Sequence, residues 1–317
     1  MPSPRAVRIS ATLAVLTGFA LPIVRRAARL GPGAVIAGAA VAPLALCVAV
    51  PRSRRRDVGV CALQMWAYLA AYKLPNAEGQ SLEHRVRVEY PIAVDRLLGG
   101  GELPSVRLQR ALAAGPEFRA YDKALIWTHW VWFAVPHTTL SYLLVRHPRR
   151  FPRAAVLTYA VFDIGAVCYW LFPTAPPWYA AERGRIDRFP AVDGDGAPVV
   201  RRMMVEYGES FWRDGWGPLY SLLGGNPLAA MPSLHFATSV MAATLLAETG
   251  PAAGGLGWTY ALALGFALVY LGEHYVADLL AGLALTVAVR RAEPLLGAPI
   301  AGVGRAVSRF AEWARAG

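Results

Sequence analysis

The sequence predicts an all-α integral membrane protein, and three observations support this fold class. First, 56% of the 317 residues are hydrophobic and only 17% are charged, which is too apolar for an ordinary soluble domain. Second, the apolar residues gather in long runs that are separated by arginine clusters. Third, ten tryptophans and thirteen tyrosines suit the aromatic belts at the two interfaces of a bilayer.

Each apolar run is long enough, or nearly so, to cross the hydrocarbon layer, which takes roughly 17–25 helical residues. The runs cover residues 9–24, 33–50, 57–73, 122–145, 154–172, 230–247, 257–272 and 275–290. We interpret residues 57–291 as a six-helix membrane domain that carries the site. Residues 1–56 would form an added membrane hairpin with a basic cytoplasmic loop, and residues 292–317 a cytoplasmic tail. A signal peptide is a weaker interpretation of the first run, since no small-residue cleavage site precedes Arg25.

The arginines orient the runs, because cytoplasmic loops carry an excess of Lys and Arg. If successive runs cross the membrane in opposite directions, three arginine clusters fall on one side, which we take as cytoplasmic. They are residues 52–56, 146–153 and 290–291. Arg25, Arg26 and Arg29 then fall outside, which conflicts with the rule. We expect a multi-pass protein of a bacterial cell membrane, since the Arg-, Ala- and Gly-rich composition is typical of a GC-rich genome.

Two long connecting segments, residues 74–121 and 173–226, fall on the outer side. The first contains "YPIAVDRLLGGGELPSVRLQRALAAG", whose pattern predicts an amphipathic interfacial helix with a Gly-Gly-Gly turn. The second is polar and rich in glycine and proline, and loops of that length are usually functional or disordered.

Charge and cysteine content exclude other classes of protein. The net charge is +11, but the arginines lie between apolar runs, so we expect no nucleic-acid partner. Cys47, Cys61 and Cys168 all lie inside apolar runs and have neither a disulfide framework nor metal-ligand spacing. We therefore expect no metal and no cofactor.

Three polar motifs interrupt the apolar sequence on the predicted outer side. They are "FPTAPPWY" (residues 172–179), "MPSLH" (residues 231–235) and "EHYVAD" (residues 273–278). The predicted topology does not depend on these motifs, yet it places all three on the same side of the membrane. We therefore predict one pocket built from distant parts of the chain. Ionisable groups inside membrane segments cost roughly 2–3 kcal/mol and are usually functional. A single interfacial histidine is more often a packing residue, but two histidine motifs favour a site.

The chemistry of these motifs suits phosphoryl transfer. His274 and Asp278 have the i, i+4 spacing that places both on one helix face, where the carboxylate can accept the Nδ1–H and leave Nε2 free to attack. Pro232 suits a first helical turn, whose free N–H groups would form an anion cradle with the Ser233 hydroxyl. His235 would lie one turn further in, facing the bound anion.

"MPSLH" followed by "HYVAD" resembles the second and third signatures of the type 2 phosphatidic acid phosphatase superfamily. With "PPWY" it looks most like the inositol phosphorylceramide synthase branch, which is related to the sphingomyelin synthases. The resemblance covers Val58 to Arg291 and implies a six-helix phosphatidic acid phosphatase-type core. It implies that His274 is the nucleophile, Asp278 its orienting carboxylate and His235 the acid that protonates the leaving group, without a metal.

The sequence departs from the family where cations are expected. The first signature's Lys and Arg are absent, and Pro176, Pro177, Trp178 and Tyr179 stand in that place; the Ser-Arg of the third signature is absent too. Arg201, Arg202, Arg213 and Lys123 are candidate replacements, or solvated charges. Glu273 would bind a polyol hydroxyl or cap a helix. His129 and His137, in "THWVWFAVPH", would line a head-group pocket or form an aromatic packing stripe.

These observations favour a phosphotransferase that moves a phospho-head-group, possibly phosphoinositol, between lipids through a phosphohistidine. A lipid or polyprenyl phosphate phosphatase, with water as acceptor, needs the same residues. A transporter or other non-enzymatic membrane protein is disfavoured because neither inverted repeats nor paired broken helices are visible. The oligomeric state does not follow from the sequence.

Overall fold

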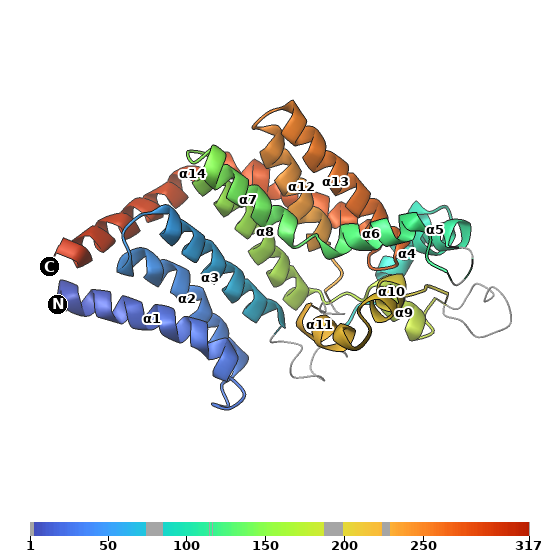
Figure 1. Cartoon of the computed structure of the whole chain (residues 1–317), viewed down its shortest axis with the longest axis horizontal. Helices are drawn as coiled ribbons and strands as arrows, with labels where there is room; N and C mark the ends of the chain where they lie inside the picture. The colour runs from blue at the N-terminus through green and yellow to red at the C-terminus, as the bar shows by residue number, and fades with distance from the viewer. Residues whose placement is uncertain are drawn as a thin grey trace. The chain divides into compact units, whose positions relative to one another are not determined.

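The protein is all-α in the computed structural model, which describes residues 3–73, 85–113, 115, 117–186, 199–223 and 229–316 (Figure 1). Within these residues no strand occurs. Four helices are long and apolar enough to cross a membrane: α1 (Pro4–Val24), α2 (Pro32–Ala49), α8 (Phe151–Leu171) and α13 (Pro251–Tyr270). A shorter apolar helix, α12, covers Leu234–Ala247. The predicted multi-pass membrane fold is confirmed.

The chain divides into two compact units. The first unit contains residues 1–79, 155–166 and 289–317, and the second contains residues 80–154 and 167–288. In the first unit α1 packs on α2, and α2 packs on α3 (Arg54–Lys73), as Figure 1 shows. The Trp66 indole donates a hydrogen bond to the Phe19 carbonyl at 3.1 Å and ties α3 to α1.

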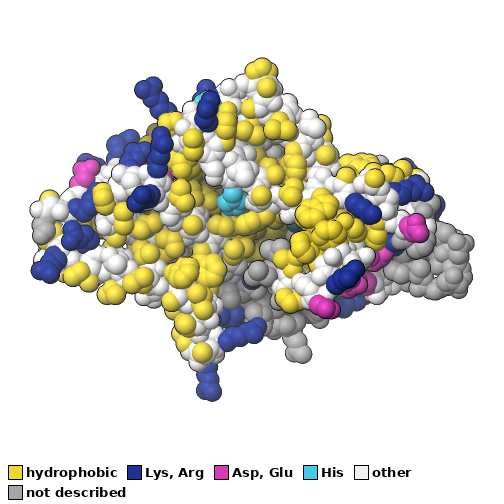
Figure 2. All heavy atoms as spheres, viewed as in Figure 1, with side chains coloured by type: hydrophobic (Ala, Val, Ile, Leu, Met, Phe, Trp, Pro, Cys, Tyr) yellow, Lys and Arg dark blue, Asp and Glu magenta, His cyan; other side chains and the backbone are white. Residues whose placement is uncertain are grey.

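Apolar side chains remain exposed on these helices, as a bilayer environment requires. On α1, Leu13, Leu16 and Ile23 are exposed by 57%, 60% and 62% of their surface. Figure 2 shows hydrophobic side chains over much of the visible surface. A soluble monomer rarely exposes apolar surface on this scale.

The second unit contains the helices of the two long connecting segments. The segment predicted to hold one amphipathic helix forms two, α4 (Glu89–Leu98) and α5 (Pro104–Leu112), separated by the Gly-Gly-Gly turn. Gly100 and Gly101 have φ of 68° and 102°, in the region that glycine adopts without strain. The second segment forms α9 (Pro177–Glu182), α10 (Met203–Trp212), the 3₁₀ turn η3 (Arg213–Gly215) and α11 (Trp216–Leu223).

Two predicted membrane runs differ from the structure. Residues 122–145 form two helices, α6 (Ala120–Trp130) and α7 (Ala134–Arg146), with a break at residues 131–133 that carries Trp132 toward α12. The last run does not end at residue 290, because α14 continues from Val276 to Ala316 through the predicted tail. The helix continues through this tail although it contains Pro294 and Pro299, residues that disfavour a helix interior.

Small residues bring the helices of the second unit close together. A Cβ atom added at Gly257 of α13 would lie 2.8 Å from Cα of Ala243 on α12. A Cβ at Gly282 of α14 would lie 2.6 Å from the Ser233 carbonyl oxygen. Close backbone approach at small residues is a usual way of packing membrane helices. Here it holds the start of α12 against the start of α14.

Candidate active site

The starts of α12 and α14 bring "MPSLH" and "EHYVAD" into direct contact. The Ser233 amide donates to the Asp278 carbonyl at 2.9 Å, and the Thr286 hydroxyl donates to the Ala237 carbonyl at 2.9 Å. These bonds fix the register between the two helices at both ends of their contact. The predicted meeting of the two motifs is therefore present in the structure.

Asp278, His274 and His235 form a continuous hydrogen-bonded chain. The His274 Nδ1 lies 3.1 Å from Asp278 Oδ2, and the His274 Nε2 lies 3.1 Å from the His235 Nδ1. A carboxylate only accepts, so the His274 Nδ1 carries the hydrogen and Nε2 presents a lone pair. His235 then donates its Nδ1–H to that lone pair. His274 is 4% exposed and Asp278 is fully buried.

The contact between His274 and Asp278 does not arise in the predicted way. The helix begins at Val276, so His274 precedes it and Asp278 lies in the first turn. Asp278 Oδ2 also accepts the Tyr275 amide at 2.9 Å, which is the bond that an acidic residue at the third helical position makes to a helix cap. The capping geometry, and not a shared helix face, brings carboxylate and imidazole together.

A second carboxylate, Asp95 of α4, holds the same helix start and was not predicted. Its two oxygens accept the Val276 amide at 3.0 Å and the Ala277 amide at 2.8 Å. Burial raises the pKa of Asp95 to about 6, although the bonds from Ala277 and Val276 lower it. The only sequence signal is one acidic residue within the apolar part of "YPIAVDRLL".

The start of α12 differs from the predicted anion cradle. The helix begins at Leu234, so Pro232 precedes its first turn and the prediction for Pro232 is wrong. Ser233 is the N-cap, and its hydroxyl accepts the Phe236 amide at 3.3 Å. Tyr169 of α8, which the sequence analysis missed, accepts the Leu234 amide at 3.3 Å and donates to the Pro232 carbonyl at 2.8 Å. Two amides of the expected cradle thus already have acceptors.

His129, near the end of α6, and Trp132, in the break that follows, enclose His235. The His129 ring stacks on it with a centroid distance of 4.9 Å, and the Trp132 ring lies 4.1 Å away. Trp132 is anchored by its indole N–H, which donates to Thr238 at 2.9 Å. His137, by contrast, packs within its own helix start, where its Nδ1 donates to the Phe133 carbonyl at 2.7 Å.

The "PPWY" motif contacts the turn that precedes Glu273 and His274. The Trp178 amide donates to the Gly272 carbonyl at 3.1 Å, and the Arg202 guanidinium stacks 3.7 Å above the Trp178 ring. Burial raises the pKa of Glu273 to about 7, while the charge of Arg202, the proximity of His274 and a bond from Trp178 oppose this rise. Glu273 Oε1 is buried and has no hydrogen-bond partner among the described residues.

The other predicted site residues have structural contacts or lie on the surface. Arg201 binds Glu206 at 3.1 Å and stacks on Phe118 at 5.3 Å. Pro176 caps α9, Pro177 begins it, and Tyr179 packs against the Arg183 guanidinium at 4.7 Å. Arg213 and Lys123 are exposed. No group of three or more His, Cys, Asp or Glu in the described part of the chain has the arrangement of a metal site.

The family model that matches this chain covers the part that carries these motifs. A family model described as the PAP2 superfamily matches residues 104–291, more than half of the sequence. The inositol phosphorylceramide synthase catalytic subunit aur1 of Schizosaccharomyces pombe is 29% identical over 123 residues, 39% of this chain and 28% of that relative. No solved structure matches. The chain belongs to the PAP2 superfamily, in agreement with the resemblance of its two histidine motifs to the type 2 phosphatidic acid phosphatases.

Proposed function

We propose that the protein is a membrane phosphotransferase that moves a phospho-head-group from a donor lipid to a lipid alcohol through a phosphohistidine on His274. The observation that carries this proposal is the hydrogen-bonded chain from Asp278 through His274 to His235. The PAP2 family and the similarity to an inositol phosphorylceramide synthase subunit support a lipid phosphate as substrate. The name of that relative also makes phosphoinositol the first head group to test.

In the first step His274 Nε2 attacks phosphorus. The N–P bond forms, the bond from phosphorus to the donor oxygen breaks, and His235, as an imidazolium, gives a proton to the leaving oxygen and becomes neutral. The Asp278 carboxylate stabilises the imidazole as it becomes positively charged. In the second step His235 takes the proton from the acceptor hydroxyl, whose oxygen attacks phosphorus and releases His274.

The His235 ring has to move for this reaction. Attack needs about 3–3.5 Å between Nε2 and phosphorus, and an acid needs about 2.6–3.2 Å to its leaving oxygen. The His274 Nε2 and the His235 Nδ1 are 3.1 Å apart, so no phosphoryl group fits between the two rings in this conformation. His129 and Trp132 enclose His235 and would guide this movement.

Arg202 and Glu273 are the proposed head-group contacts. Arg202 also binds Glu182 at 3.1 Å and the Tyr220 hydroxyl at 2.9 Å, so its position is fixed before substrate arrives. Its charge would balance a phosphate next to His274. The buried Glu273 Oε1 is a hydrogen-bonding group that a head-group hydroxyl would satisfy. We propose that this site faces the outer leaflet, as the arginine clusters predict.

Trapping of the phosphohistidine tests the proposal. Purified protein in nanodiscs is mixed with a p-nitrophenyl or an alkyl phosphodiester of inositol. Peptides labelled with the transferred phosphoinositol group are identified by mass spectrometry. His274→Ala should give no labelled enzyme with either compound. His235→Ala should slow labelling by about 10²–10⁴-fold with the alkyl leaving group, but far less with nitrophenolate, which leaves without a proton.

Two results of this labelling experiment would contradict the proposed roles of His274 and His235. Label on a residue other than His274 would overturn the proposed nucleophile. An equal deficit of His235→Ala with both leaving groups would mean that His235 positions phosphate and does not protonate the leaving oxygen. Adding a lipid alcohol after labelling then separates the two outcomes of the second step, because transfer to the alcohol marks a transferase and transfer to water alone marks a phosphatase.

The orientation of the protein in the membrane can be tested with two matched cysteine variants. Ser53→Cys and Ser210→Cys add one exposed thiol each, before α3 and within α10. In intact cells a membrane-impermeant maleimide should label the cysteine at position 210 and leave that at position 53 unlabelled. The reverse pattern would put the substrate in the inner leaflet.

A further inference from the structure

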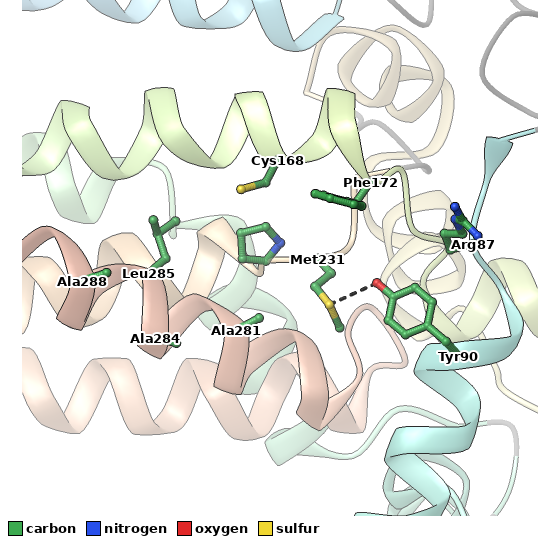
Figure 3. Close-up of a pocket in the computed structure, with 10 residues that line it drawn as sticks. Arg87, Tyr90, Cys168, Phe172, Met231, Ala281, Ala284, Leu285 and Ala288 are labelled. Carbon is green, nitrogen blue, oxygen red and sulfur yellow. Dashed lines mark hydrogen bonds between the residues drawn. The ribbon is translucent and has the colours of Figure 1, made fainter.

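A cavity of about 670 Å³ adjoins the start of α12 (Figure 3). Its volume lies in the range of about 300–1,000 Å³ that ligand pockets occupy. Its lining comes from four separate parts of the second unit: Arg87 and Tyr90, Cys168 and Phe172, Met231 and Pro232, and Ala281, Ala284, Leu285 and Ala288. All but Arg87 and Tyr90 present apolar or thiol side chains.

Small side chains on α14 form one wall of this cavity. Ala281, Ala284 and Ala288 recur at helical spacing, one turn and more beyond Asp278, and leave space along the helix surface. Figure 3 shows them in a row that leads away from Met231. The space is therefore elongated and apolar, which suits a hydrocarbon chain.

The opposite end of the cavity is polar and rigid. Figure 3 shows Arg87 and Tyr90 together at this end. The Tyr90 hydroxyl lies 2.9 Å from Thr174 Oγ1 and 3.2 Å from Met231 Sδ. The Arg87 amide donates to the Pro173 carbonyl at 2.8 Å, and its carbonyl accepts the Ala175 amide at 3.0 Å. The described part of the chain contains no ion pair of the Arg87 guanidinium.

We propose that this cavity binds one hydrocarbon chain of the donor lipid, with Arg87 at the anionic end of that lipid. The proposal rests on the proposed function in that the donor is a lipid phosphate. Apolar lining on one side, and on the other a cation that forms no ion pair with the described residues, match a single-chain anionic amphiphile. Met231 and Pro232 lead directly into Ser233 and His235, so a chain bound here directs its head toward the catalytic segment.

Cys168 supplies an internal probe of occupancy. Its thiol lines the cavity, whereas Cys47 and Cys61 belong to the first unit and serve as controls in the same sample. The His274→Ala enzyme is placed in phosphatidylcholine nanodiscs and treated with N-ethylmaleimide. Alkylation of each cysteine is followed by peptide mass spectrometry, with dodecyl phosphate, dodecanol or inorganic phosphate added. This background removes turnover, so the measurement does not depend on the phosphohistidine.

Dodecyl phosphate should slow alkylation of Cys168 by about fivefold or more and leave Cys47 and Cys61 unchanged. Dodecanol should protect Cys168 from alkylation less than dodecyl phosphate does, and inorganic phosphate should not protect it. Arg87→Gln should remove the difference between dodecyl phosphate and dodecanol. Arg85→Gln is the matched control, because Arg85 donates to the Trp170 carbonyl and does not line the cavity.

Filling the cavity gives an independent result. Ala284→Trp should prevent protection, whereas Val287→Trp, at an exposed position of the same helix outside the lining, should not. If Ala284→Trp lowers the melting temperature, Ala284→Leu replaces it. Equal protection by dodecyl phosphate and dodecanol, or full protection in Ala284→Trp, would overturn the proposal. Protection without any phosphohistidine in the wild type would instead leave the cavity proposal standing and remove the proposed function.

Discussion

The two units of the chain bury polar groups very differently. In the described residues, every buried polar or charged side chain except Thr158 belongs to the second unit. The first unit has polar contacts such as that of Gln64 Nε2 with Asp163 at 2.9 Å, but Gln64 is only partly buried and Asp163 is exposed. The second unit has Asp95, Asp278 and His274 in its interior.

The physical reason for this difference is the free energy needed to bury a polar or charged group. A buried carboxylate or imidazole stabilises a structure only when its hydrogen bonds are satisfied, and apolar residues of similar volume would usually serve as well or better. Their concentration at the start of α14 therefore indicates chemistry. The first unit is built as a membrane anchor would be, and the second as an enzyme would be. Four experiments test what these buried groups do, in order of decreasing expected effect.

The largest difference should appear between Asp278→Asn and Asp163→Asn, one aspartate from each unit. Asn at position 278 keeps the shape but loses the charge that stabilises the His274 imidazolium, so turnover should fall by about 10³–10⁴-fold. Asn at position 163 should change turnover less than threefold. Both are measured as steady-state rates on protein of unchanged melting temperature. Near wild-type turnover of a folded Asp278→Asn enzyme would refute the proposed role of Asp278.

A smaller effect should separate two neighbouring arginines. Arg202→Gln removes the cation beside Glu273 and should raise KM for an anionic lipid about 10–100-fold, because a charge-assisted contact contributes about 1.5–3 kcal/mol. Arg201→Gln breaks the pair with Glu206 and should mainly lower stability. A KM effect confined to Arg201→Gln would reverse the assignment of the two residues.

Asp95→Asn should loosen the helix start that carries Asp278. An amide offers one oxygen where the carboxylate accepts two backbone N–H groups, so one amide of α14 loses its acceptor. The cost should be about 1–3 kcal/mol of unfolding free energy, measured by denaturant titration in micelles. Because Asp95 positions α14 and does not touch substrate, kcat should fall more than KM rises. Unchanged stability would show that the two bonds are dispensable.

The smallest effect concerns pH. The pKa of Glu273 is raised to about 7 by burial, so the carboxyl is neutral below that pH and becomes negative above it. The negative form repels a phosphate and offsets Arg202, so KM for an anionic substrate should rise a few-fold between pH 6 and pH 8. Glu273→Gln, which stays neutral, should flatten this dependence. An identical slope in both enzymes would assign it to another group.

Hydropathy and turn residues were enough to predict the membrane fold and helical structure beside the Gly-Gly-Gly turn, and the two polar motifs were visible in the sequence. Hydropathy and turn chemistry are local properties that can be read without knowing the neighbours. The order of the motifs and the arginine clusters was enough to predict that His235, His274 and Asp278 share a pocket, because topology limits which ends can meet.

How these residues meet, and which groups support them, depends on tertiary contacts. Asp95 and Tyr169 reach the site from α4 and α8, far away in sequence, and such contacts leave no periodic signal. The choice of Arg202 over Arg201 depends on which guanidinium stacks on Trp178. The break that encloses His235 lies inside a run that is apolar enough for one helix, and the packing of Trp132 on α12, which hydropathy does not measure, is visible only in the folded chain.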